Sequence, residues 1–120
     1  MSATLDERLD ALLELAARDM DRLAGGAAVC TFTRAGVPVP GIKYAEGRWA
    51  ALRELHRARR RSPDDGSLAD GILGTWRDQL AALRERGAGP DWIAYRTGGV
   101  DALTELLEAA PDTAGTRSEP

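Results

Sequence analysis

Apolar residues recur at intervals of three and four through most of this chain of 120 residues, and this spacing favours amphipathic α-helices over strands. The pattern is clearest between Thr4 and Leu23, where one stripe contains Leu5, Leu9, Leu12, Leu13, Ala16, Met20 and Leu23. Thr4 and Glu7 form a capping-box pair, and Gly25 follows the stripe, so a helix is predicted here. The stripe also approximates a short heptad seam, which leaves open whether it packs on the chain's own core or on a second copy.

Four further helices are predicted. A second helix is predicted from Tyr44 to about Arg60, with Ala45, Trp49, Leu52 and Leu55 on one side. A third is predicted to begin at a capping box of Ser67 and Asp70 and to stop before Gly87, with a stripe of Ala69, Ile72, Leu73, Trp76, Leu80 and Leu83. Trp76 continues this stripe and is expected in the core. Pro90 is expected to start a short helix that ends at Gly98 and Gly99, before a last helix over residues 100–110.

Residues 26–49 include the one departure from helical spacing, and they contain the only Cys, Phe and Lys of the chain. The run from Ala28 to Thr33 alternates with a period of two and is rich in β-branched residues, which is typical of a strand. Gly36 suits a tight turn, and Pro38 restricts the returning strand to a sheet edge because proline lacks a backbone N–H. These features predict a β-hairpin at about residues 27–42.

Taken together, the patterns predict a mainly α protein of the α+β class. The expected architecture is a small helical bundle of four to five helices, with one β-hairpin inserted between helix 1 and helix 2. The length suits one domain, so residues 1–110 are expected to form a single helical domain, and the polar, proline-bounded residues 111–120 a disordered tail.

No apolar run approaches the roughly 18 residues that a membrane span needs, and the charged N-terminal region lacks an apolar signal core. A cytoplasmic location without membrane contact is therefore expected.

Since His56 and Cys30 are the only His and Cys, no metal, cofactor or catalytic constellation is predicted. The glycines around Lys43 match no phosphate-binding loop. Enzyme activity is accordingly disfavoured, although it stays open.

Charge is distributed unevenly. Residues 43–61 carry a net charge of +5, whereas residues 1–25 carry −3 and residues 62–120 carry −6. The basic segment ends in Arg57, Arg59, Arg60 and Arg61. These arginines either pair with the chain's own acids, such as Asp64 and Asp65, or face an anion. An overall net charge of −3 argues against a dedicated duplex-DNA binder, because such domains are usually basic throughout.

The favoured function is a non-catalytic binding or accessory protein, acting as a homodimer or as the small partner of a larger protein or enzyme. One alternative is a small-molecule-binding enzyme or subunit with a pocket between the hairpin and the Trp-bearing helices, open to a small anionic ligand. Another is a transcriptional regulator that contacts nucleic acid through its basic helix. The predicted binding residues are Lys43, Tyr44, Arg48, Trp49, Arg53 and His56. Lys43 and Arg48 are expected to be largely exposed beside a helix start whose free N–H groups suit an anion.

Overall fold

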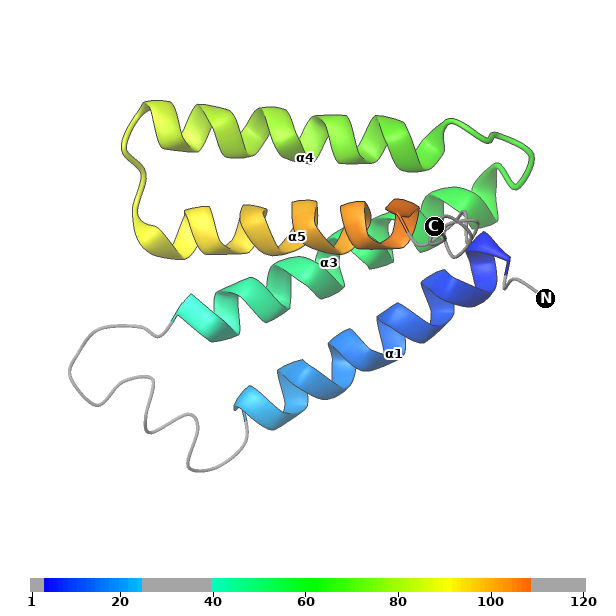
Figure 1. Ribbon diagram of the computed structural model, residues 1–120, viewed down its shortest axis with the longest axis horizontal. Helices are drawn as coiled ribbons and strands as arrows, with labels where there is room; N and C mark the ends of the chain where they lie inside the picture. Colours follow the sequence, from blue (N-terminus) through cyan, green and yellow to red (C-terminus); the bar gives the residue numbers. More distant parts are fainter. Residues whose placement is uncertain (1–3, 25–39, 109–120) are drawn as a thin grey trace, which may run out of the picture.

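The computed structural model describes residues 4–24 and 40–108, which form four α-helices joined in an up-down-up-down order. The helices are α1 (Leu5–Ala24), α3 (Pro40–Arg61), α4 (Leu68–Glu85) and α5 (Pro90–Glu108). Figure 1 shows α3 and α5 side by side in the centre and running in the same direction, with α1 and α4 outside them. The bundle of helices expected from the apolar stripes is therefore confirmed.

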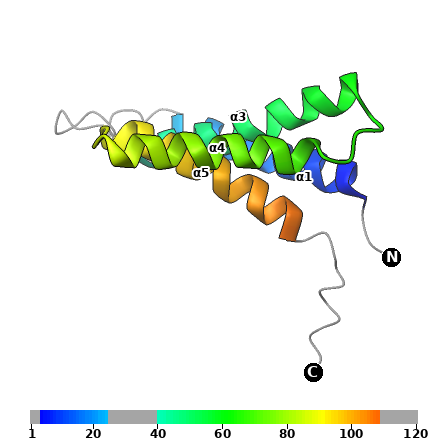
Figure 2. The ribbon, with the colours of Figure 1, turned by 90° about the horizontal axis from the view of Figure 1, so that it is seen from above.

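The two pairs of helices that lie diagonally across the bundle differ in how closely they approach: α3 and α5 are in direct contact, whereas α1 and α4 are apart. The central helices α3 and α5 make the most extensive contact in the described part, α1 packs mainly on α3, and α4 packs mainly on α5. The outer helices α1 and α4 do not contact each other. In the view from above, the C-terminal ends of α3 and α5 diverge (Figure 2). One long face of α3 is consequently left without a helix packed over it.

The core lies where the apolar stripes of all four helices meet. Its largest fully buried side chains are Leu9, Leu52, Leu55, Leu103 and Leu106. The stripe of α1 supplies buried Leu9 and Ala16, and it also packs Leu5, Leu12 and Leu13 against the same cluster. The apolar stripe of α1 therefore packs on the chain's own core.

Glycines allow α3 and α5 to pack closely against each other. Gly47 of α3 lies so close to the carbonyl group of Tyr95 that a β-carbon would overlap it, and Gly98 of α5 has the same relation to the carbonyl group of Tyr44. A β-carbon on Gly99 would overlap the ring of Trp76. The prediction that Gly98 and Gly99 end a helix is therefore wrong. They lie inside the continuous helix α5, where their lack of a side chain permits close helix packing.

The predicted α+β class, with a β-hairpin at residues 27–42, is also wrong. The described residues contain no strand, and Pro40, Gly41 and Ile42 form the first turn of α3 instead of the end of a hairpin. Proline is well suited to a first helical turn, because the N–H it lacks would have no partner within the helix. The rest of the predicted hairpin, including Cys30, lies outside the described residues, as does the predicted tail at 111–120.

The helix-end signals were predicted with mixed success. The capping box of α1 is confirmed, since the Thr4 N–H donates to Glu7 Oε1 at 2.9 Å and the Glu7 N–H donates to Thr4 Oγ1 at 3.0 Å. Ser67 is the N-cap residue of α4 but makes no side-chain capping bond. Its hydroxyl donates instead to Asp65 Oδ1 at 2.6 Å. Helix α4 ends before Gly87, as expected, and Gly87 adopts a φ of 65°.

Candidate binding face on helix α3

All six predicted binding residues lie on α3, but they point to different sides of it. A helix turns by about 100° per residue, so consecutive positions cannot share one surface. Tyr44 and Arg48 face α5, Lys43 lies near the start of α5, and Trp49, Arg53 and His56 line an open groove beside α1. The six residues therefore do not form a single site.

Tyr44 and Arg48 tie α3 to α5. The Tyr44 hydroxyl donates to Asp101 Oδ2 at 2.6 Å, and Arg48 Nη2 donates to Glu105 Oε1 at 2.5 Å. Burial, together with the neighbouring Asp101 carboxylate, raises the pKa of Tyr44 above its ordinary value of 10.0. The side chain of Arg48 is only 20% exposed, so the expectation that it is largely exposed was wrong. Both residues hold the two central helices together.

Lys43 is placed differently again. It is paired with Glu46 at 3.2 Å and borders a small depression of about 210 Å³ beside Asp91, Trp92 and Tyr95. Because α3 begins at Pro40, Lys43 follows the first three helical residues instead of preceding the helix. The predicted anion site at a helix start over residues 43–49 therefore loses its structural basis.

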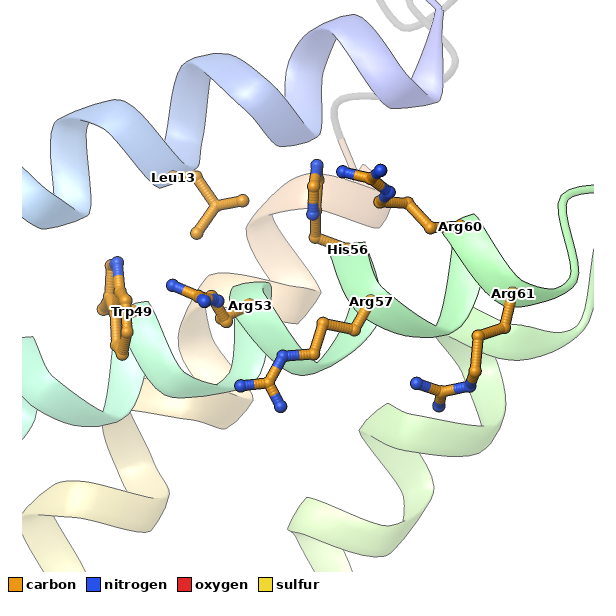
Figure 3. Close-up of a pocket in the computed structure, with 7 residues that line it drawn as sticks. All are labelled: Leu13, Trp49, Arg53, His56, Arg57, Arg60 and Arg61. Carbon is orange, nitrogen blue, oxygen red and sulfur yellow. The ribbon is translucent and has the colours of Figure 1, made fainter.

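The groove beside α1 has a volume of about 460 Å³ and is lined mostly by cationic side chains. Figure 3 shows its lining, with Leu13 coming from α1 and the remaining residues from α3: Trp49, Arg53, His56, Arg57, Arg60 and Arg61. Trp49 and His56 point toward α1, whereas Arg57 and Arg61 point away from it (Figure 3). A neighbouring depression of about 320 Å³ shares Trp49, Arg53, Arg57 and Arg61.

These four shared residues define what we call the basic face of α3. Trp49, Arg53, Arg57 and Arg61 are spaced at intervals of four, so they form a row that turns gradually around the helix, from the side facing α1 at Trp49 to the side away from α1 at Arg61. The Arg53 guanidinium lies 5.1 Å from the centre of the Trp49 ring, within the range of a cation–π interaction. Arg60 adjoins this row on the side of α1 (Figure 3).

The chain's own acids engage only part of the basic segment. Asp6 of α1 accepts two hydrogen bonds from Arg59, at 2.5 and 3.1 Å, and Asp10 Oδ1 lies 3.7 Å from His56 Nε2. The hydrogen bond from Arg59 lowers the pKa of Asp6 below its ordinary value of 3.8. Among the described residues, Arg57, Arg60 and Arg61 form no ion pair. The predicted pairing with Asp64 and Asp65 is not found there, and Asp65 accepts hydrogen bonds from Ser67 instead.

The three tryptophans have different roles. Trp76 is 3% exposed, stacks on Tyr95 with a ring-centre distance of 5.5 Å, and donates from Nε1 to Glu54 Oε1 at 2.9 Å, which confirms it as a core residue. Trp49 is half-buried at the groove, and Trp92 is 63% exposed. They do not form one cluster. Leu13 is the groove residue that the sequence did not indicate, because it was one member of a core stripe.

No group of three or more His, Cys, Asp or Glu side chains within the described ranges is arranged to hold a metal ion. None of the four helices is long and apolar enough to cross a membrane. Comparison with known proteins found no matching family model, curated protein or solved structure.

Proposed function

We propose that this chain is a non-catalytic binding protein that presents the basic face of α3 to an acidic segment of a larger protein. The observation that carries the proposal is the exposure of Arg57, Arg60 and Arg61 beside an open groove, with no ion pair to other described residues. Cations kept in water without a partner add little to the stability of the fold. They are well suited to attract and orient a partner of opposite charge.

Trp49 supports the same proposal. Tryptophan and arginine are the residue types most enriched among those that dominate binding energy at protein interfaces. Here a half-buried Trp49 lies in the same row as three arginines, next to Leu13 across the groove. The face thus combines an apolar patch with solvated charge, which is the combination that interfaces between soluble proteins use.

A homodimer is also predicted from the sequence. The stripe of α1 that suggested self-association is packed in the chain's own core through Leu9 and Ala16, and the predicted hairpin lies outside the described residues. Self-association stays a prediction that light scattering tests, because a dimer has twice the 12.9 kDa mass of the chain.

A titration of fluorescently labelled poly-L-glutamate with the full chain tests the proposed function. The variant pair Arg57→Glu and Arg61→Glu should weaken binding at least about tenfold, and raising the salt from about 0.05 M to about 0.5 M should weaken it in the parent. The matched control reverses two exposed arginines of α4, Arg77→Glu and Arg84→Glu. An equal loss in both double variants would show that net charge, and not this face, governs binding.

A further inference from the structure

We infer that the acidic segment held by the basic face is an α-helix, with carboxylates at intervals of four residues and an apolar side chain that packs against Trp49 and Leu13. This inference rests on the proposed function, and it specifies the conformation and register of the partner. It follows from the layout of the row, from the shape of the bundle and from the change of chemistry along the groove.

The row from Trp49 to Arg61 covers about 18 Å at 1.5 Å per residue, with about 6 Å between successive members. A partner helix with carboxylates at i, i+4 and i+8 repeats at the same 6 Å interval. One carboxylate can therefore meet each of Arg53, Arg57 and Arg61 over about two turns. Rows of side chains spaced by four residues are also the ridges on which neighbouring helices pack.

The surroundings favour a helix over an extended segment. An extended chain leaves its backbone N–H and C=O groups in need of partners, which a bound strand normally finds at a sheet edge. The basic face lies on a helix, whose backbone bonds are made internally, and no strand is present among the described residues. A helical partner satisfies its own backbone, and it would lie along the side of α3 that the separation of α1 and α4 leaves uncovered.

The groove also changes character along its length. Its apolar end contains Trp49 of α3 and Leu13 of α1, and its basic end contains Arg57, Arg60 and Arg61 (Figure 3). A partner helix that matches both ends of the groove has its apolar residue and its carboxylates on the same face. The apolar residue lies at one end of the row of carboxylates. This fixes the register of the partner helix on α3.

A protein helix fits this surface better than a nucleic acid does. Asp6 and Asp10 of α1 lie beside the basic segment, paired with Arg59 and His56. Residues 1–25 and 62–120 carry net charges of −3 and −6. A long polyanion that extends beyond the face would meet these negative regions, whereas a short helix places its charges only where the arginines are.

The test uses the full chain and three labelled peptides of identical composition, followed by fluorescence anisotropy. In the first, leucine is followed by glutamates at intervals of four on an alanine-rich helix. The second has the same residues in a scrambled order that spreads the glutamates around the helix. The third exchanges the positions of leucine and one distant alanine. We expect the first peptide to bind at least about tenfold more tightly than the other two, and to gain helical circular dichroism on binding.

The outcomes separate the inference from the proposed function. Equal binding of all three peptides, lost in the Arg57→Glu and Arg61→Glu variant but kept in the Arg77→Glu and Arg84→Glu control, would overturn the helical register and leave the proposed function intact. Failure of every peptide and of poly-L-glutamate to bind would overturn both. A labelled DNA duplex that binds more tightly than the first peptide, and is lost with the same variant, would overturn the choice of a protein partner.

Discussion

Gly98 of α5 lies directly against the backbone carbonyl of Tyr44 in α3, and no space for a side chain remains between them. Gly47 of α3 has the equivalent relation to the backbone carbonyl of Tyr95 in α5. Close contact at these two points, together with the hydrogen bonds of Tyr44 and Arg48 to α5, fixes how α3 is oriented. The basic face is therefore positioned by the part of the molecule that packs most tightly.

We expect Gly98→Ala to destabilise the fold by about 1–3 kcal/mol or more, because the added methyl group overlaps a backbone carbonyl that cannot move without shifting a whole helix. The matched control is Gly74→Ala on α4, where an added β-carbon meets nothing within 4 Å. That change should stabilise the protein by up to about 1 kcal/mol through helix propensity. Urea unfolding measures both, and a Gly98→Ala variant as stable as the parent would contradict the close crossing.

Replacing Trp76 by Ala should cost about 3–5 kcal/mol, because the ring fills the space between Gly99, Tyr95 and the rest of the core. Trp92→Ala removes the same side chain from a position that is 63% exposed, and it should change stability by no more than about 0.5 kcal/mol. Thermal melting followed by circular dichroism compares the two. Similar losses in both variants would mean that Trp76 is not the main core aromatic residue.

Asp6 and Arg59 should make a stability contribution that depends on pH. The pKa of Asp6 is lowered in the folded state, so the contribution is present above the ordinary value of 3.8 and disappears as the pH falls through the folded-state pKa. Asp6→Asn should cost no more than about 1 kcal/mol at neutral pH, because the Asp6 side chain is 64% exposed and water screens the pair. Its cost should vanish in acid. Asp78→Asn on α4 serves as the control, and an Asp6→Asn cost that is the same at both pH values would rule out the ion pair as its cause.

Tyr44 should titrate above its ordinary pKa of 10.0, because burial and the adjacent Asp101 carboxylate disfavour the tyrosinate. Because the folded state favours the protonated hydroxyl, Tyr44 stabilises the fold at pH values below its unfolded-state pKa. This stabilisation is lost as the pH rises through the folded-state pKa. Tyrosinate absorbance of the parent, minus that of Tyr44→Phe, isolates this residue from Tyr95. A midpoint for Tyr44 below that of a free tyrosine would be inconsistent with the bond to Asp101.

Local signals in the sequence were sufficient for much of the fold. The capping pair of Thr4 and Glu7 and the apolar stripe behind it correctly placed α1, since both depend on residues close together in the chain. Gly98 and Gly99 were misinterpreted as a helix end because glycine has two opposite uses in helices. Only the neighbouring helices, α3 with Tyr44 and α4 with Trp76, show which of the two uses applies here.

The six residues grouped by the sequence all lie on α3, but the structure places their side chains on different sides of that helix. Arg48 and Trp49 are adjacent in sequence and were grouped together, yet their directions differ by about 100° around α3. Arg48 bonds to α5, and Trp49 lines the groove with residues four and eight positions later. The spacing of four was visible in the sequence. Which side of α3 remained uncovered was not, because that depends on α1 and α4 lying apart.

The glycine contacts between α3 and α5 also restrict how this protein can change during evolution. A single methyl group is already too large at Gly47 or Gly98, so neither position can be substituted by a sequence of small, tolerated steps. Solvent-facing positions and the lengths of the connections carry no such restriction. Distant relatives with the same helix crossing should therefore share glycine at these two positions, and at Gly99, even after the rest of their sequences has diverged.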